Sequence, residues 1–328
     1  MTVTPLLRIG DRGTAVRDLR QRLAATGASI ASDDIYDEAT KAAVRSFQER
    51  RGLRVDGICG PETWGALIES GFRLGDRLLY LSGDMLRGDD VADLQRRLNA
   101  LGFDAGREDG ILGPETETAL RNFQRNAGIT ADGVCGPASL RSLDMVGGLA
   151  AGSVAAVRER EALRRDARRL DGLRVFLTAD PEIGALAPAV ARGLYTLGAV
   201  VGLDTSGDDA HVLATEANRF RAGIVVTLTT GVDPGVRCAF FATEKFRSEG
   251  GYCLAQRLTE ALRTTLKDVE DPVGRTYRIL RETRMSAVVC ELGRRDDAGV
   301  TSALNARLPE ITDALVTGIR RGVEEPIE

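Results

Sequence analysis

Ile224-Val-Val-Thr-Leu-Thr-Thr230 is a run of apolar and β-branched residues, typical of a strand that is buried on both faces. Runs of similar character precede and follow it, at 174–178, 199–203, 238–242 and 287–292. Between the strands lie segments with helical spacing of apolar residues, at 186–197, 210–221, 251–266 and 304–322. This alternation predicts an α/β domain over residues 173–328, with a sheet covered by helices on both faces.

Short motifs in this half resemble those of the zinc-dependent N-acetylmuramoyl-L-alanine amidases, which cut the bond between muramic acid and peptide in bacterial cell wall. Ala217-Asn218 and Thr227-Leu228-Thr229 follow the rhythm of the family's Ala-Asn helix and its strand ending in Ser-Ile-His. Asp180-Pro181-Glu182-Ile183-Gly184 resembles Asp-Pro-Gly-His-Gly, and 284–293 resembles the segment that carries the catalytic glutamate. The resemblance implies the amidase fold for this half.

The same resemblance implies that Ile183 and Thr229 stand at the positions of two zinc-binding histidines. Neither an aliphatic side chain nor a hydroxyl replaces a neutral imidazole as a zinc ligand. The family's ligand glutamate has no counterpart in 185–189, and nothing places the nearby Glu182 as a ligand. His211 is the single histidine of the chain, matches no family ligand, and is expected on the surface or at a helix start. We therefore predict no metal, no cofactor and no enzymatic activity.

Glu291 matches the family's catalytic glutamate, which acts as a general base on zinc-bound water. Without an activated water, a lone carboxylate hydrolyses amides negligibly, so Glu291 is predicted to be non-functional in catalysis. We expect a structural role instead, with the carboxylate accepting hydrogen bonds from nearby backbone N–H groups. An alternative is an active amidase whose metal site uses other residues, such as His211 and Glu291 with a cysteine.

The first half of the chain is an internal repeat. Asp56-Gly-Ile-Cys-Gly-Pro61 returns as Asp132-Gly-Val-Cys-Gly-Pro137, and the apolar positions upstream return with nearly the same offset. Each unit predicts three short helices, the last opening with Gly-Pro. Both units resemble the peptidoglycan-binding module found beside many wall hydrolases, which implies an all-α three-helix fold for 1–72 and for 73–146.

Candidate glycan-binding residues follow from that resemblance in the second unit, namely Asp109, Gly110, Gly113, Asp132 and Gly133. The first unit lacks the inner Asp-Gly motif and reads Asp33-Asp34-Ile-Tyr-Asp-Glu there. The apolar residues of both units, such as Val16, Leu19, Leu23, Phe47 and Trp64, are expected in the cores. A second interpretation is that both units are scaffolds now used for protein contacts.

Composition narrows the class of protein. The net charge of −4 gives no case for nucleic acid, and no apolar run reaches the ~20 residues of a transmembrane helix. The N-terminus does not read as a signal peptide, and five cysteines without a Cys-x-x-Cys pair are expected to be buried thiols, which together favour the cytoplasm. The charge-dense stretch within 147–172 predicts a linker helix.

We therefore predict a cytoplasmic, catalytically inactive amidase homologue that regulates peptidoglycan precursor synthesis through protein binding. The order of modules resembles that of actinobacterial wall regulators, which implies UDP-N-acetylglucosamine carboxyvinyltransferase as partner and a serine/threonine kinase as a further input. A third hypothesis is a sensor that binds a muropeptide, a peptidoglycan fragment or a nucleotide-linked precursor in the old catalytic groove.

Overall fold

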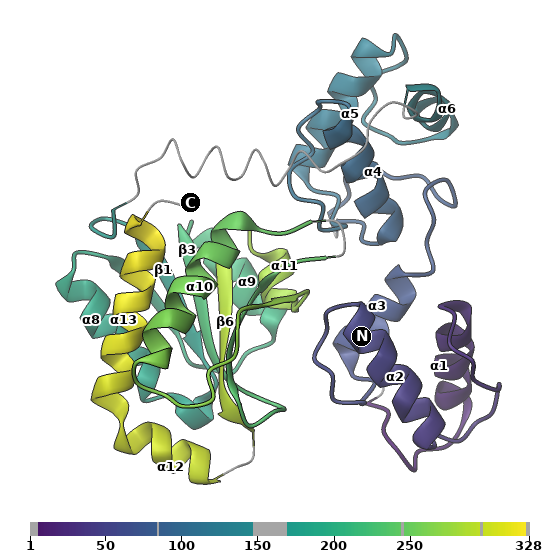
Figure 1. Cartoon of the computed structure of the whole chain (residues 1–328). Helices are drawn as coiled ribbons and strands as arrows, with labels where there is room; N and C mark the ends of the chain where they lie inside the picture. Colours follow the sequence, from purple (N-terminus) through teal and green to yellow (C-terminus); the bar gives the residue numbers. More distant parts are fainter. Residues whose placement is uncertain (1–5, 84, 147–168, 244–245, 296–297, 326–328) are drawn as a thin grey trace. The chain divides into compact units, whose positions relative to one another are not determined.

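The structure is a computed structural model that describes residues 6–83, 85–146, 169–243, 246–295 and 298–325 (Figure 1). The chain divides into two compact units, Met1–Val157 and Arg158–Glu328. The predicted linker helix lies mostly outside the described residues, so it stays a prediction, as do the boundaries drawn at 72, 146 and 172. No helix among the described residues is long and apolar enough to span a bilayer.

The first unit begins with three helices, α1 (Thr14–Ala25), α2 (Glu38–Arg50) and α3 (Pro61–Glu69). Their apolar faces share one core, which contains Val16, Leu19, Leu23 and Phe47 as predicted. Trp64 is only partly buried and packs against the edge of this core. A bridge between Leu7 and Cys59 ties the chain start to the segment before α3.

The second half of this unit repeats the arrangement with α4 (Asp89–Ala100), α5 (Pro114–Asn126) and α6 (Pro137–Val146). It has its own core, and a bridge between Leu79 and Cys135 takes the place of the bridge between Leu7 and Cys59. Glycines precede both α3 and α6, and proline occupies the first position of each helix, where a missing N–H leaves no bond unmade. The predicted all-α repeat is confirmed.

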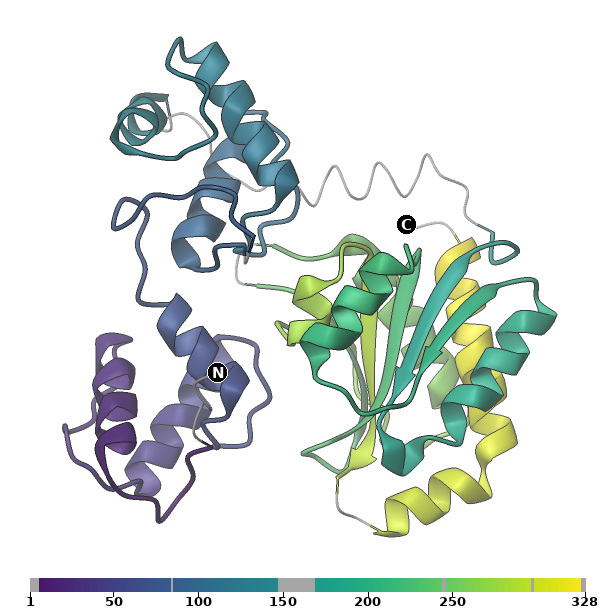
Figure 2. The same cartoon turned by 180° about the vertical axis from the view of Figure 1, so that it is seen from behind.

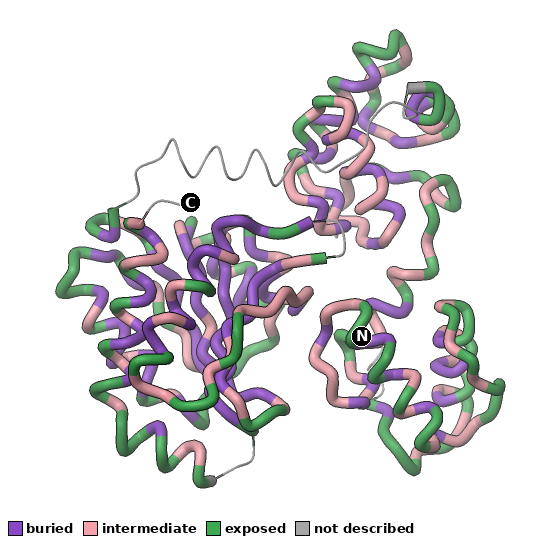
Figure 3. Tube along the Cα trace, viewed as in Figure 1, coloured by how far each residue is buried: buried purple, intermediate pink, exposed green. Residues whose placement is uncertain are grey.

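The second unit is built on a sheet of six strands in the order β2-β1-β3-β6-β4-β5. The strands are β1 (Arg174–Ala179), β2 (Val200–Asp204), β3 (Ile224–Gly231), β4 (Val236–Phe241), β5 (Val273–Arg275) and β6 (Ser286–Arg294). β1, β2, β3 and β6 run parallel, and β4 pairs antiparallel with β6. The three central strands β1, β3 and β6 are buried along nearly their whole length (Figure 3).

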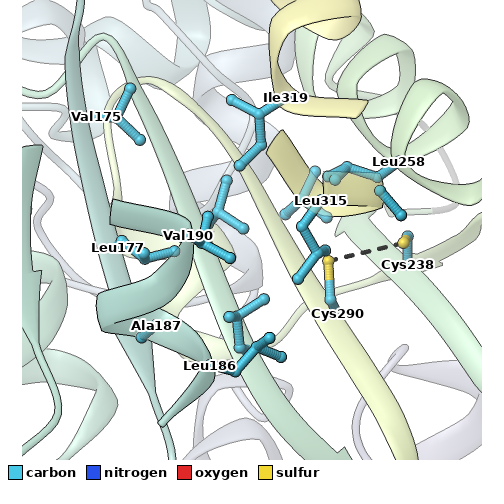
Figure 4. Close-up of a cluster of buried hydrophobic side chains, with 14 of the residues drawn as sticks. Val175, Leu177, Leu186, Ala187, Val190, Cys238, Leu258, Cys290, Leu315 and Ile319 are labelled. Carbon is cyan, nitrogen blue, oxygen red and sulfur yellow. Dashed lines mark hydrogen bonds between the residues drawn. The ribbon is translucent and has the colours of Figure 1, made fainter. Parts of the chain in front are cut away.

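Helices cover both faces of this sheet, which confirms the predicted α/β class. One face carries α8 (Leu186–Thr196), α10 (Glu249–Arg263) and α13 (Leu308–Glu324), seen in front of the strands in Figure 1. The opposite face carries α9 (Ala210–Arg219) and α11 (Arg278–Glu282), which come to the front in Figure 2. The larger core lies on the first face, where Val190, Leu258 and Leu315 meet the strands (Figure 4).

One predicted helix was wrong, and two short elements were missed. The last helix is not continuous over 304–322, because α12 (Ala298–Ala306) ends before Arg307 and α13 begins anew with Pro309 in its first turn. Proline supplies no N–H for a continuing helix, so a new helix starts there. The short elements β5 and α11 were not predicted, and both lie between α10 and β6.

Candidate functional site

Two of the positions that the sequence analysis singled out in the second unit, Thr229 and Glu291, meet at the carboxyl ends of parallel strands. Thr229 on β3 lies directly beside Glu291 on β6, and Glu291 lies beside Arg237 on β4. Side chains alternate between the faces of a strand, and the neighbours Leu228 and Cys290 belong to the core under α10 and α13. Thr229, Glu291 and Arg237 therefore form a row on the opposite face, the one that α9 and α11 cover.

Asp180, directly after β1, is the hydrogen-bond centre at one end of this row. Its Oδ2 accepts from the Thr229 hydroxyl at 2.5 Å and from the Thr230 N–H at 3.5 Å. The same oxygen lies 3.1 Å from Nη2 of Arg295, which follows β6. The backbone N–H of Asp180 in turn donates to Leu228 O at 3.0 Å. The carboxylate is thus held by donors from β3 and from the end of β6.

Glu291 is buried, with 4% of its surface exposed, and its carboxylate is held by side chains. The Tyr277 hydroxyl donates to Oε1 at 2.9 Å, and Nε of Arg237 lies 3.8 Å from Oε2. The expectation that Glu291 would accept backbone N–H bonds was wrong. Its partners come instead from the residue before α11 and from β4, which the sheet brings beside β6.

Arg237 is surrounded by acidic groups. Beside Glu291 it contacts Asp233 at 2.9 Å and Glu270 at 3.0 Å. Burial works against the charged form, but Glu270, Glu291 and Asp233 together raise the pKa of Arg237 above its usual value. The guanidinium is therefore charged at any physiological pH.

Ile183, the second expected ligand position, does not reach this row. It ends the short helix η2 (Pro181–Ile183), is 4% exposed and belongs to the hydrophobic core with Leu186 and Leu304. Glu182, one position earlier, is exposed. A further constraint comes from Gly231, where an added Cβ would meet the Glu291 side chain at 3.3 Å. A larger residue at the end of β3 would therefore require the Glu291 side chain to shift by a few tenths of an ångström.

These residues do not fit the zinc ion that the amidase resemblance implies. Zinc in proteins takes imidazole, thiolate and carboxylate ligands with free lone pairs. Here a threonine stands in place of an imidazole, an isoleucine is buried in the core, and both nearby carboxylates already bind a guanidinium. Among the described residues, no group of three or more His, Cys, Asp and Glu side chains is arranged to hold a metal.

Among the described residues, His211 makes no hydrogen bond or ion pair with Thr229, Glu291 or Arg237. It lies in the first turn of α9, and its Nδ1 is 2.5 Å from Oε2 of Glu282 at the end of α11. Glu282 also binds Arg278 at 2.8 Å, so it is already paired. The five cysteines are buried and free, and no group of three or more His, Cys, Asp and Glu side chains is found among the described residues that could hold a metal. The constellation of His211, Glu291 and a cysteine that was raised as a rescue site gains no support.

In the first unit, the candidate glycan residues take part in one recurring internal motif. Gln124 donates to Asp132 Oδ1 at 2.9 Å and to the Val134 carbonyl at 3.0 Å, while its own oxygen accepts from the Gly133 N–H at 2.9 Å. Gly133 has a φ of 74°, which favours glycine. A buried glutamine therefore closes each Asp-Gly turn, and part of each aspartate is used inside the fold.

The same motif occurs at Asp109-Gly110 with Gln95, and at Asp56-Gly57 with Gln48. Gly113 acts as the residue before α5. The role of Asp109 and Asp132 toward a glycan stays a prediction. The glutamines were quoted in the motifs but not recognised as site residues, although Gln48 and Gln124 each precede their Asp-Gly by the same 8 residues, and Gln95 precedes its own by 14.

Arg20 explains why the first unit lacks its inner Asp-Gly turn. It occupies the place in α1 that Gln95 has in α4, and it is 3% exposed. Its guanidinium donates to the Ala31 and Ile35 carbonyls at 2.7 Å each and to Asp37 at 3.0 Å. The longer side chain reaches the carbonyls of a differently shaped loop, so this half of the unit is rebuilt around a buried cation.

Comparison with known proteins agrees with this architecture. The family model for the peptidoglycan binding domain matches residues 12–67 and 87–143. The chain is 34% identical to the N-acetylmuramoyl-L-alanine amidase CwlM of Mycobacterium tuberculosis over 367 aligned residues, which span 97% of this chain and 88% of the relative. It is 32% identical to the N-acetylmuramoyl-L-alanine amidase CwlL of Bacillus licheniformis over 40% of this chain and 43% of the relative.

Among solved structures, the amidase Ami1 of Mycobacterium smegmatis matches 47% of this chain and 98% of its own at 15% identity, with a TM-score of 0.38. The long match to CwlM shows that the chain belongs to the N-acetylmuramoyl-L-alanine amidase family. Within that family it is similar to CwlM in its whole arrangement, with peptidoglycan-binding repeats ahead of an amidase-like α/β domain.

Proposed function

We propose that this chain is a non-hydrolytic member of the amidase family that regulates peptidoglycan precursor synthesis by binding other proteins in the cytoplasm. The observation that carries the proposal is the replacement of the ligand chemistry at the strand ends. Thr229 bonds to Asp180, Ile183 is packed in the core, and Glu291 is held between Tyr277 and Arg237. None of these arrangements supports an activated water.

The retained glutamate fits this proposal. A general base needs a substrate proton or a bound water within reach of a free lone pair. Glu291 is buried, and both of its oxygens already face a donor, one the Tyr277 hydroxyl and the other Arg237. It therefore serves as an acceptor that ties β6 to β4 and to the start of α11.

The proposed partner is UDP-N-acetylglucosamine carboxyvinyltransferase, with a serine/threonine kinase as a further input. Both rest on resemblance, and the peptidoglycan-binding repeats supply a second route to wall components. The test is a rate assay of the purified transferase with and without the full chain. The proposal predicts a change in the transferase rate that saturates with added chain, and no saturable change would contradict it.

A second candidate is an active amidase, which the printed names of CwlM and CwlL favour. The variant Glu291→Gln separates the two proposals, because it keeps the size and the hydrogen-bonding end of the side chain. Under our proposal neither parent nor variant releases peptide from muropeptides, and both act equally on the transferase. Hydrolysis by the parent that is lost in Glu291→Gln would establish the amidase, with Ami1 as the positive control.

A third candidate is a sensor that binds a muropeptide or a nucleotide-linked precursor beside the row of Thr229, Glu291 and Arg237. A ligand that binds the folded state raises the melting temperature as its concentration increases. A concentration-dependent shift with such a fragment, absent in an Arg237→Gln variant, would support the sensor. No shift with any fragment would leave protein binding as the mode of action.

A further inference from the structure

Two carboxylates flank Thr229 at the strand ends, and each has its own arginine. Asp180 receives the Thr229 hydroxyl and lies 3.1 Å from Arg295, while Glu291 lies beside Thr229 in the sheet and 3.8 Å from Arg237. Asp180 follows β1 and Glu291 lies on β6, on either side of β3, and two such acidic groups repel each other unless positive charge stands between or beside them. Arg295 pairs with Asp180, whereas Arg237 is shared between Glu291 and the nearer carboxylates of Asp233 and Glu270.

The arginines are placed by the backbone as well as by their side chains. Arg295 follows β6 and donates its own N–H to the Gly231 carbonyl at 2.8 Å, across the irregularity where β3 and β6 shift register. Arg237 lies in β4, directly opposite Glu291. Both side chains are thus presented to the carboxylates from ordered strand ends rather than from free loops.

We propose that Arg295 and Arg237 have taken over the charge compensation that a metal ion supplies in family members with histidine ligands. In this account the fold no longer needs a cation from solution to hold Asp180 and Glu291 beside Thr229. The site is also closed to one, because a guanidinium next to each carboxylate repels a dication, and Asp180 already accepts hydrogen bonds from Thr229 and Arg295. The inference rests on the contacts alone and holds whether or not the transferase is the partner.

Hydrogen exchange of the full chain tests the role of the Arg295 charge. The readout is the exchange rate of peptides that cover Thr229 and Thr230, next to the Asp180 carboxylate. Arg295→Gln keeps donors but removes the charge, Arg295→Lys keeps the charge, and Arg294→Gln is the matched control, because Arg294 is exposed and makes no described ion pair. Exchange measures local opening, so a rate ratio reports the change in that equilibrium.

We expect Arg295→Gln to speed this exchange by about two- to fivefold, the range of a partly exposed ion pair. Arg295→Lys should restore most of the protection, and Arg294→Gln should match the parent. In an Asp180→Asn background the effect of Arg295→Gln should shrink, since no charge remains to be compensated. Equal protection in Arg295→Gln and Arg295→Lys would overturn the proposal, because a hydrogen bond alone would then suffice.

Zinc binding tests the claim that the site is closed. Thr229→His returns an imidazole to the position, either with Arg295 intact or together with Arg295→Gln. We expect zinc to bind the double variant more tightly by on the order of tenfold, measured by competition with a chromophoric chelator, because one repelling charge is gone. Equal affinity in the two backgrounds, including no detectable binding in either, would contradict the proposal. Neither the hydrogen-exchange experiment nor the zinc-binding experiment uses the transferase, so the outcomes of both are independent of the proposed partner.

Discussion

Single side chains decide how the hydrogen bonds of the repeats and of the strand ends are arranged. A buried glutamine closes each Asp-Gly turn of the repeats, and where Arg20 replaces it the neighbouring loop is rebuilt. At the strand ends of the second unit, Thr229 and its acidic neighbours are held by arginines. In both places a change of one residue type redirects a whole set of hydrogen bonds.

The glutamine motif predicts a large effect from a small truncation. Gln48→Ala removes the donor to Asp56 and the acceptor of the Gly57 N–H, and it leaves buried polar groups without partners. We expect a loss of about 2–3 kcal/mol in the free energy of unfolding. Urea unfolding followed by the fluorescence of Trp64, the single tryptophan, measures it. Glu49→Ala on the same helix is the control, and an equal effect in both variants would count against the motif.

Asp37 predicts a pH dependence for the first unit. Hydrogen bonds from Thr40 and the Arg20 guanidinium lower the pKa of Asp37 to about 2, while an aspartate in an unfolded chain has a pKa of about 4. The unfolded state therefore takes up the proton first, and the stability from this group is present above about pH 4 and lost as pH falls toward 2. Urea unfolding at a series of acid pH values should show a flatter profile for Asp37→Asn than for the parent.

At the scale of elements, the packing of α10 against α13 depends on glycine. A Cβ added at Gly318 would lie 2.8 Å from the Leu258 Cα, and one added at Gly322 would lie 3.1 Å from the Leu254 Cα. Backbone cannot move aside as a side-chain end does. These glycines therefore set the distance between the two helices that cover the larger core.

Gly318→Ala is expected to destabilise the second unit by about 1–3 kcal/mol, in spite of the better helix propensity of alanine. Faster hydrogen exchange in α10 and α13 would show it. Gly65→Ala is the matched control, because Gly65 lies in α3 with open space at its Cβ position. That variant should be neutral or slightly stabilising, and a stabilising effect at Gly318 would contradict the close packing.

The elements predicted correctly from the sequence are those in which apolar or β-branched residues recur at a regular spacing. The alternation of β-branched strands and amphipathic helices gave the α/β class, and the repeated Asp-Gly-x-Cys-Gly-Pro gave the two three-helix repeats. The elements that were not predicted are short. β5 has 3 residues and α11 has 5, which is too few for a regular spacing of apolar residues to be recognised. The split between α12 and α13 was missed although Pro309 marked it.

For the site, sequence comparison pointed to Ile183, Thr229 and Glu291 but gave none of their partners. Tyr277, Arg237 and Arg295 come from different elements, and only the sheet brings them to one edge. The sequence around a carboxylate does not show which cationic side chain the fold will place beside it. That is why the bonds of Glu291 were wrongly expected to be with the backbone.

At the scale of the whole molecule, the reactivity of the cysteine thiols tests how well the interiors of both units are closed to solvent. All five cysteines are free and buried, and burial raises the pKa of Cys59 and of Cys135 to about 12. Thiolates are the reactive form, so the native chain should react slowly with a thiol reagent. Five thiols should react after unfolding in guanidinium chloride. Fast reaction of the native chain would contradict the burial that the structure describes.

The proposals for this molecule depend on one feature, a family site whose ligands have been replaced by bonds within the fold. The most direct measurement is zinc per chain, by elemental analysis of protein purified without chelator and then dialysed. We predict a value near zero, together with no release of peptide from muropeptides. About one zinc per chain, removable by a chelator with loss of amide hydrolysis, would contradict the account.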